Sequence, residues 1–471
     1  ADIQSKRTGG IIVETLDDAN VPTRFHDILI ESNVITTVRN QGIVAAGNRV
    51  NMSDYPNTTA WHARKATQVI IRGNTISDVT KNALILRLAD STGLVEHNVC
   101  FNTATLDTGN TMFTASCDGS VFQYNEGYSN NATARDGSLY DADLRSTGII
   151  FQYSYSHDNG HGLFWQYPSS SGPNSNIIVR YNVSRNDRGN IFAFSGDAGG
   201  ASTSLIHNNV VYLPPGSTNL IIDARSGNHT YTFANNIFYL EGQGVGYDTA
   251  GHAATVDSNV FYGAHPATEP SDARKITADP KLVSPGSGGI GLSTLAGYQL
   301  QSGSPCIKTG ATMYVPSPGP YDLFGNSISL SSGLDIGVHQ SSYLPPGSGP
   351  SFATLFLGQT ADSDADGDGV AALIEYLLGG STNGNDMAKL PQPVYQGNTL
   401  SLTVVERVND PKITTVGEVC GDLTSWSSSG VSRSLDPDQT GVPAGFARAT
   451  YAASVGSASK SFIRIRVNLA P

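Results

Sequence analysis

The densest cluster of titratable side chains lies between Glu126 and His161. Several titratable residue types in one short stretch are typical of a catalytic site. Asp141 and Asp143 are separated by one residue. On a β-strand they would therefore share a face, with Cα atoms about 6.5–7 Å apart. Carboxylates about 6.5–9.5 Å apart suit inverting hydrolysis of a glycosidic bond, because one acid protonates the leaving oxygen while one base activates water.

We predict Asp141 and Asp143 as the catalytic carboxylates, with Glu126 as the substitute and His157 or Arg135 orienting them. Neighbouring turns of a stacked β-structure lie about 4.8 Å apart, which would bring Glu126 and His157 within reach of the pair. Repulsion between close carboxylates raises the pKa of one of them and keeps it protonated as the acid. The candidates for substrate binding are Arg135, Asp136, Asp158, His161, Trp165 and Arg87.

The same cluster allows other interpretations. β-Elimination on a uronic-acid glycan needs a base, and a cation that neutralises the sugar carboxylate. The cluster holds no lysine, but Arg135, Arg145, His157 or Tyr140 could act as that base. A non-catalytic carbohydrate-binding or adhesive solenoid would instead show aromatic stripes without a carboxylate cluster. Buried, hydrogen-bonded aspartates or a structural cation site would explain the acidic residues without catalysis.

A second acidic segment matches the spacing of an EF-hand calcium loop. Carboxylates stand at loop positions one, three, five and twelve, and glycine stands at position six. The predicted ligands are Asp364, Asp366, Asp368, the carbonyl of Val370, and Glu375. A short helix through Leu378 should follow. We expect this Ca²⁺ to be structural, and hydrolysis at the first cluster requires no cofactor.

An asparagine recurs in one fixed context and predicts the scaffold that positions these residues. It occurs at Asn33, Asn74, Asn98, Asn125, Asn182, Asn209, Asn236 and Asn259. With Ser154 as a substituted position, the steps from Asn74 onward are 24, 27, 29, 28, 27, 27 and 23 residues. Asparagine suits a tight corner between strands, because it tolerates the left-handed conformation and bonds neighbouring backbone. The period predicts a parallel β-helix, right-handed by the bias of parallel crossovers.

A second column of short apolar runs predicts which side chains face the core. Its aligned members are Ile43, Leu84, Met112, Leu139, Leu163, Ile191 and Leu220. Strict alternation from Leu139 would turn Asp141 and Asp143 inward, so catalysis by this pair requires a bulge or bend nearby.

Composition and linker signals predict the domain organisation. The all-β chain should comprise a β-helix catalytic domain (1–340), a Pro/Gly/Ser-rich linker (341–363), the calcium loop with its helix (364–390) and a small β-sandwich-like module (391–471). The formal net charge of −12 argues against nucleic acid as a partner. No apolar run is long enough to span a membrane. Because a strand begins at once after Gly9, we expect further residues before Ala1.

The stretch from Glu126 to Trp165 carries a family resemblance. Asp-Gly-x-x-x-Asp-x-Asp, followed by Phe-Gln-Tyr-Ser-Tyr-Ser-His-Asp-Asn, resembles right-handed β-helix enzymes that act on polysaccharides. The similarity is to glycoside hydrolases of the α-fucosidase, fucanase and xylanase type, and more distantly to pectate and alginate lyases. It covers about residues 9–340. Ala142 separates the two aspartates, unlike the adjacent pair of polygalacturonases, which leaves the reaction open.

The resemblance also implies a cellular setting. The calcium loop after a linker resembles dockerin-like modules of secreted bacterial enzymes. Together these similarities imply a secreted, monomeric enzyme that degrades a polysaccharide, with sulfated and uronic glycans among the substrates considered. Four cysteines have no metal-ligand spacing, and Cys100 and Cys117 could either pair or remain buried thiols.

Overall fold

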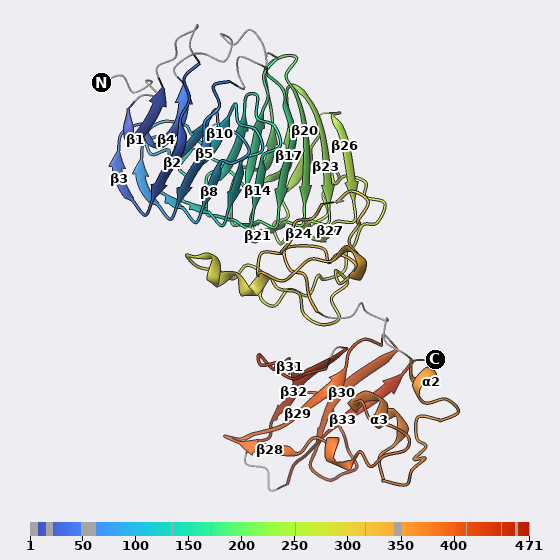
Figure 1. Cartoon of the computed structure of the whole chain (residues 1–471). Helices are drawn as coiled ribbons and strands as arrows, with labels where there is room; N and C mark the ends of the chain where they lie inside the picture. The colour runs from blue at the N-terminus through green and yellow to red at the C-terminus, as the bar shows by residue number, and fades with distance from the viewer. Residues whose placement is uncertain are drawn as a thin grey trace. The chain divides into compact units, whose positions relative to one another are not determined.

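The computed structural model describes most of the chain and divides it into two compact units (Figure 1). The described residues are 8–15, 22–48, 63–132, 136–170, 172–249, 251–315, 317–342, 351–410, 412–443, 445–456 and 460–470. The first unit comprises residues 1–300 and 308–341, and the second comprises 301–307 and 342–471. No helix among the described residues has the length and apolar character needed to cross a bilayer.

The first unit is a parallel β-helix, as predicted, built from three nine-stranded sheets among its described residues. Sheet A contains β1 (Gly9–Thr15), β4 (Gln41–Asn48), β7 (Leu84–Arg87), β10 (Met112–Ala115), β13 (Tyr140–Asp143), β16 (Phe164–Tyr167), β19 (Asn190–Phe194), β22 (Leu220–Ala224) and β25 (Gly246–Asp248). Sheet B contains β2 (His26–Glu31), β5 (Thr67–Arg72), β8 (Leu94–Glu96), β11 (Val121–Gln123), β14 (Ile150–Gln152), β17 (Asn174–Arg180), β20 (Ala201–His207), β23 (Asn228–Ala234) and β26 (Ala253–Asp257).

Sheet C completes each turn of the coil, and less regular chain follows it. Its strands are β3 (Val34–Val38), β6 (Thr75–Val79), β9 (Val99–Phe101), β12 (Glu126–Tyr128), β15 (Tyr155–His157), β18 (Val183–Arg185), β21 (Val210–Leu213), β24 (Ile237–Leu240) and β27 (Val260–Gly263). After β27 the first unit continues through two short 3₁₀ helices, η2 (Leu292–Tyr298) and η3 (Leu330–Ser332).

The recurring asparagines form a hydrogen-bonded ladder at the corner between sheets B and C. Asn182 Nδ2, for example, donates to Asn209 Oδ1 at 3.0 Å and to the carbonyl of Phe151 at 3.0 Å. The left-handed conformation falls on the residue before each asparagine, such as Tyr181 with φ of 52°. The expectation that the asparagine itself adopts it was therefore wrong. The amide instead satisfies backbone groups that the sharp turn leaves unpaired.

Ser154 replaces asparagine in one turn of the ladder, and Tyr140 fills the space. The Tyr140 hydroxyl donates to Ser154 Oγ at 2.6 Å, and Asn125 Nδ2 donates to the Tyr140 oxygen at 3.1 Å. The backbone N–H of Asn125 donates to Ser154 Oγ at 3.1 Å. A buried tyrosine from sheet A thus completes the ladder, because buried polar groups need partners.

The register of sheet A corrects the predicted core column. Met112 pairs with Tyr140, and Tyr140 pairs with Phe164. In β13, β16 and β19 the core-facing strand position is therefore one residue later than predicted, and in β22 it is two residues later, at Ile222. Leu139 is also buried in the core, but it precedes the strand. No register shift occurs in β13, so the bulge required by alternation from Leu139 is not needed.

The second unit is built from antiparallel strands and two short α-helices. Strands β28 (Pro393–Gln396), β29 (Thr399–Arg407), β32 (Phe446–Ser454) and β31 (Val431–Leu435) form one sheet, and β30 (Ile413–Cys420) pairs with β33 (Phe462–Leu469). The helices are α2 (Phe352–Leu355) and α3 (Ala372–Leu378), and a 3₁₀ helix, η4, spans Met387–Lys389. Phe352, Phe356 and Tyr376 share one apolar cluster, which ties α2 to α3. Helix α2 lies in the span predicted as a linker, of which residues 343–350 lie outside the described residues.

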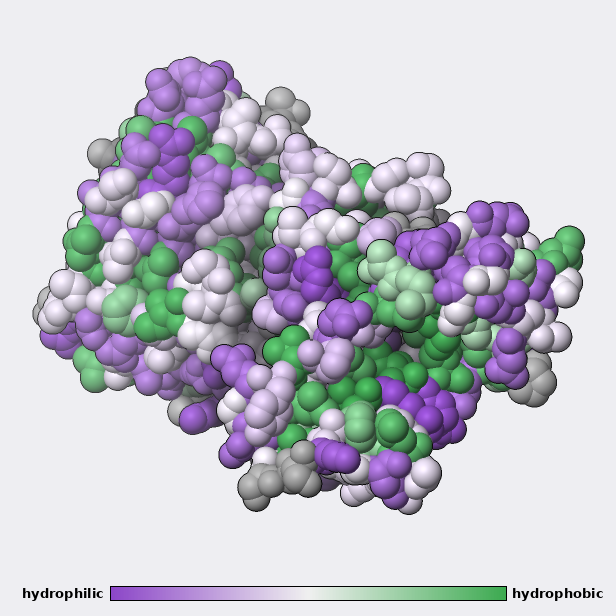
Figure 2. All heavy atoms as spheres, turned by 90° about the horizontal axis from the view of Figure 1, so that it is seen from below, coloured by the Kyte–Doolittle hydropathy of each residue, from purple (hydrophilic) through white to green (hydrophobic). Residues whose placement is uncertain are grey.

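Burial of apolar side chains is extensive but incomplete. The four cysteines are buried and free, so Cys100 and Cys117 do not pair. Some large apolar side chains remain exposed, including Leu357 at 85% and Val34 at 78%. Seen from below, hydrophobic side chains lie among hydrophilic ones on the surface (Figure 2). Such a mixture is usual for proteins, because polar atoms cannot cover the whole surface.

Candidate active site

A pocket lies over the outward face of sheet A, along β13, β16, β19 and β22. Its volume is about 450 Å³, which falls within the range of roughly 300–1,000 Å³ that is usual for small-ligand sites. The residues that matter most for its chemistry are Asp136, Asp141, Asp143, Trp165, Asp223 and Arg225. Successive strands of a parallel sheet lie about 4.8 Å apart, so the pocket follows the axis of the coil.

Strand β13 directs Asp141 and Asp143 into this pocket. Tyr140 and Ala142 belong to the core of the coil, and alternate residues of a strand point to opposite faces. The two aspartates therefore face outward, as catalysis requires. In the same outward column, β7 and β10 carry the buried apolar residues Ile85 and Phe113. The column changes from apolar to acidic at β13.

Asp141 is a buried carboxyl of the pocket. Its side chain accepts a hydrogen bond from Asn110 Nδ2 at 2.8 Å through Oδ2. Among the described residues, Oδ1 has no hydrogen-bond partner. Burial raises the pKa of Asp141 well above its ordinary value, and the charges of Asp143 and Asp136 raise it further. A raised pKa favours the protonated carboxyl, which is the form that can donate a proton.

Asp143 and Asp136 are the two other carboxylates at this end of the pocket. Asp143 Oδ1 accepts a hydrogen bond from the Leu144 N–H at 2.9 Å. Asp136 Oδ2 accepts one from Thr108 Oγ1 at 3.1 Å. Both carboxylates line the same pocket as Asp141, and their negative charges raise its pKa. The predicted pair and the predicted binding residue Asp136 are thus brought together.

Trp165 and Tyr167 provide the aromatic surface of the pocket. They follow Asp141 and Asp143 on the next strand, in direct register with them. Trp165 Nε1 donates to Ser195 Oγ at 2.9 Å, and the Tyr167 hydroxyl donates to Asp197 at 3.0 Å. These bonds fix both rings. An aromatic ring held at a pocket wall offers an apolar face for a bound ring.

The far end of the pocket is formed by Asp223, Arg225, Asn190 and His161. Arg225 Nε forms an ion pair with Asp223 Oδ2 at 2.7 Å, and Asn190 Nδ2 donates to the same oxygen. Burial lowers the pKa of His161, and the positive charge of Arg225 lowers it further. The His161 ring is therefore neutral at pH 7. Of the predicted substrate-binding residues, His161 and Trp165 line the pocket, whereas Asp223 and Asn190 line it without having been predicted.

Glu126 and His157 lie on sheet C, away from the aspartate pair. Their expected approach to Asp141 and Asp143 was wrong, because stacking brings together equivalent positions of one sheet. Glu126 Oε1 instead lies 3.1 Å from His157 Nε2 and accepts the Gly291 N–H at 2.7 Å. Both side chains are buried in contacts that attach the segment around η2 to sheet C.

Two predicted binding residues, Asp158 and Arg87, also lie elsewhere. Asp158 interacts with His157 Nδ1 at 2.8 Å and with Arg185 at 3.2 Å. Burial lowers the pKa of His157, but its hydrogen bonds with Asp158 and Glu126 outweigh this effect and raise it. Arg87 is placed 5.9 Å from the centroid of the Phe113 ring and does not line the pocket. Arg135 lies outside the described residues.

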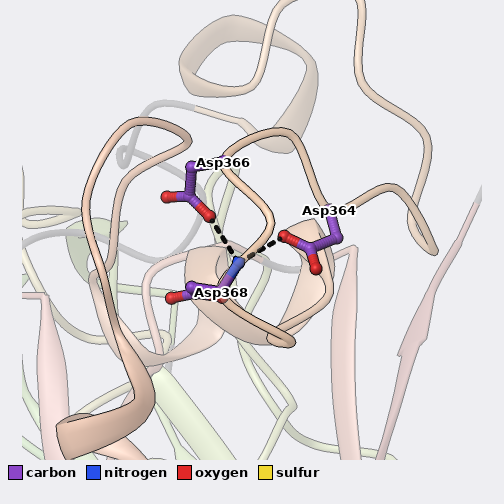
Figure 3. Close-up of side chains that lie close together, drawn as sticks. All are labelled: Asp364, Asp366 and Asp368. Atoms are coloured by element: carbon purple, nitrogen blue, oxygen red, sulfur yellow. Dashed lines mark hydrogen bonds between the residues drawn. The ribbon is translucent and has the colours of Figure 1, made fainter.

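The predicted calcium loop brings three carboxylates together in the second unit. One oxygen each from Asp364, Asp366 and Asp368 lies within 4.8 Å of the others, and the Asp368 N–H contacts Asp364 and Asp366 (Figure 3). Val370 N–H donates to Asp368 Oδ1 at 2.7 Å. This arrangement concentrates negative charge in a short loop.

Glu375 adds a fourth carboxylate from helix α3. It is 1% exposed, and among the described residues neither of its side-chain oxygens has a hydrogen-bond partner. Burial raises the pKa of Glu375 to about 7, with further contributions from Asp366 and Asp368. A buried carboxylate without a partner is costly. The three converging aspartates offer the oxygen ligands that a divalent cation prefers.

Comparison with known proteins finds similarity over part of the chain. No protein-family model matches it. A segment of 208 residues is 33% identical to a lacto-N-biosidase of Bifidobacterium longum subsp. longum, covering 41% of this chain. The chain spans 12% of the length of that relative. A solved complex of XylC with xylose gives a TM-score of 0.37 at 15% identity, covering 55% of this chain and 49% of that one.

Proposed function

We propose that the chain is a glycoside hydrolase whose reaction takes place at the carboxylates of β13. The observation that carries this proposal is the burial of Asp141 beside Asp143 in a pocket, with a pKa raised well above the ordinary value. The partial similarity to a lacto-N-biosidase supports the same class of reaction. Glycosidases usually use two neighbouring carboxyl groups, one protonated as the acid and one ionised.

In the proposed mechanism Asp141 is the general acid. Its proton passes to the glycosidic oxygen as the bond to the leaving sugar breaks. Asp143, two residues further along β13 and on the same outward face, acts on the sugar as the ionised partner. It either activates a water molecule or attacks the anomeric carbon directly. The first route inverts the anomeric configuration and the second retains it, and NMR of the first-formed product distinguishes them.

The proposed substrate is a neutral oligosaccharide or polysaccharide, and the first compound to test is a chromogenic lacto-N-bioside. The full chain should release the chromophore and generate reducing sugar. The same panel should include uronic and sulfated polysaccharides. Ultraviolet absorbance of unsaturated uronates, without reducing sugar from neutral substrates, would identify a lyase instead. Binding without either product would identify a carbohydrate-binding protein.

We also propose that Asp364, Asp366, Asp368 and Glu375 bind one structural Ca²⁺, with the Val370 carbonyl as a further ligand. The support is the convergence of three carboxylates and the buried, unpartnered Glu375. Bound metal would neutralise their repulsion and hold the loop against α3. Calorimetric titration of the full chain with CaCl₂ tests this directly. An extracellular location belongs to the proposal, because calcium is abundant enough there to fill sites of modest affinity.

A further inference from the structure

We propose that Asp223, with Asn190 and Arg225, forms a subsite that binds hydroxyl groups of a neutral sugar, and that the pocket rejects uronic and sulfated sugars. This inference deepens the proposed glycosidase function and rests on it. It assigns a substrate class to the pocket and a role to a residue that the sequence pattern did not single out.

Asp223 is contacted by two donors at one of its two carboxylate oxygens. Its side chain is 3% exposed, and both contacts described above, from Arg225 and Asn190, meet Oδ2. Among the described residues Oδ1 has no donor, so that oxygen can accept hydrogen bonds from a ligand. The Arg225 side chain is 58% exposed, so its remaining N–H groups can donate to the oxygens of the same sugar. Carboxylate and guanidinium together match a group that both donates and accepts, as a hydroxyl does.

The charged residues that line the pocket are mostly acidic. Four lining residues are aspartates, whereas Arg225 is the one arginine or lysine that lines it among the described residues. The charge of Arg225 is already paired with Asp223, and His161 is neutral for the reasons given above. Even with Asp141 protonated, the pocket carries net negative charge. A uronate or sulfate entering it would meet like charges in a partly desolvated space, which opposes binding.

Asp141 and Asp223 lie three strands apart along the pocket. Asp141, Trp165, Ala193 and Asp223 follow one another in register. Three steps of about 4.8 Å separate the Cα atoms of the two aspartates by about 14 Å. Asp223 is therefore too far away to act on the bond that Asp141 protonates. The small Ala193 leaves room beside Trp165 for a sugar ring to extend between them.

The test compares Asp223→Asn with wild type in the full chain, using the chromogenic lacto-N-bioside. Losing a charge-assisted hydrogen bond should raise KM about 10- to 100-fold, while kcat changes little, because the contact is made equally in ground and transition states. Arg225→Gln, an exposed change, should raise KM by a smaller factor. Asp248→Asn is the matched control, because Asp248 follows Asp223 in register on β25 but does not line the pocket.

Calorimetry supplies a readout that does not depend on turnover. Wild type should bind lacto-N-biose and fail to bind digalacturonate, and Asp223→Asn should lose affinity for lacto-N-biose while keeping native melting. Equal affinity in wild type and variant, or tighter binding of digalacturonate, overturns the inference. If wild type hydrolyses the bioside but KM is unchanged in Asp223→Asn, the inference fails and the proposed function stands. If wild type neither binds nor hydrolyses neutral sugars, both fail.

Discussion

Asp141 and Asp223 lie in one outward column of sheet A, three strands apart, and face the same pocket. Their surroundings differ. Asp141 lies among carboxylates and has a raised pKa, whereas Asp223 forms an ion pair with Arg225 at 2.7 Å. The same residue type at equivalent positions of the coil is thus suited to two roles. One aspartate can donate a proton, and the other can bind a neutral group.

Replacing Asp141 by asparagine should abolish most of the activity without loss of the fold. The amide has nearly the same shape but cannot donate the proton, so kcat should fall about 100- to 10,000-fold. Burial of an ionisable group against like charges opposes folding at neutral pH. The variant should therefore melt at the same temperature as wild type or higher. Initial rates and thermal melting at pH 7 check both parts.

His157→Gln provides the contrast, because the structure places His157 on sheet C with Glu126. This variant should retain wild-type kcat and lose thermal stability. The pKa of His157 is raised in the folded state, so its stabilising contribution is complete below the ordinary pKa of about 6.5 and disappears as pH rises through the folded value. A loss of activity equal to that of Asp141→Asn would place the reaction at sheet C instead.

The pH profile should report the raised pKa of Asp141. The acid must be protonated, so kcat/KM should fall on the alkaline side as pH rises through that pKa. The negative charge of Asp136 contributes to the raised value. Asp136→Asn removes this charge, lowers the pKa of Asp141 and should move the alkaline limb to lower pH. Asp90→Asn, outside the pocket lining, serves as the control. If the alkaline limb of kcat/KM stays in place in Asp136→Asn, the charge of Asp136 does not act on Asp141.

The repeat made the β-helix predictable from the sequence. The sequence did not determine which residues of a short strand face the core. Asparagine at nearly constant spacing reports a backbone need that every turn shares. Strand β13 has only four residues, and both Leu139 and Tyr140 are buried. Alternation alone could not decide which of the two begins the strand, and the choice reverses the direction of Asp141.

The composition of the site was predictable only in part. Asp141, Asp143 and Asp136 are close in sequence, so their proximity could be foreseen. Glu126 and His157 lie 15 and 16 residues from Asp141 in the sequence but belong to another sheet. Asp223 lies about 80 residues from Asp141 and reaches the pocket through the stacking of turns. A column-by-column alignment with the correct phase would have placed it in register with Asp141.

Tyr140 and Ser154 should be energetically coupled, because the tyrosine hydroxyl completes the asparagine ladder. Tyr140→Phe should lower the free energy of unfolding by about 1–3 kcal/mol, since buried ladder groups lose a partner. Ser154→Asn alone should also destabilise, because the larger amide competes with the hydroxyl for space. In the double variant the amide can occupy that space. The double should thus be more stable than the sum predicts, with coupling of about 0.5–3 kcal/mol in urea melts. Simple additivity would show that the two sites act independently.

Calcium should stabilise the second unit. The difference in melting temperature between Glu375→Gln and wild type should change sign between chelator and calcium. In the presence of a chelator the variant should melt at a higher temperature than wild type, because it removes an unpaired buried charge close to Asp366 and Asp368. In millimolar calcium the order should reverse, because wild type keeps the full ligand set and gains about 2.7 kcal/mol when free metal is a hundredfold above Kd.

Asp362→Asn is the control, an exposed change beside the loop at a non-ligand position. It should melt like wild type both with chelator and with calcium. Differential scanning calorimetry of the full chain measures each case, and parallel assays should show turnover unaffected by the chelator. Equal melting of wild type with calcium and with chelator would contradict metal binding at this loop.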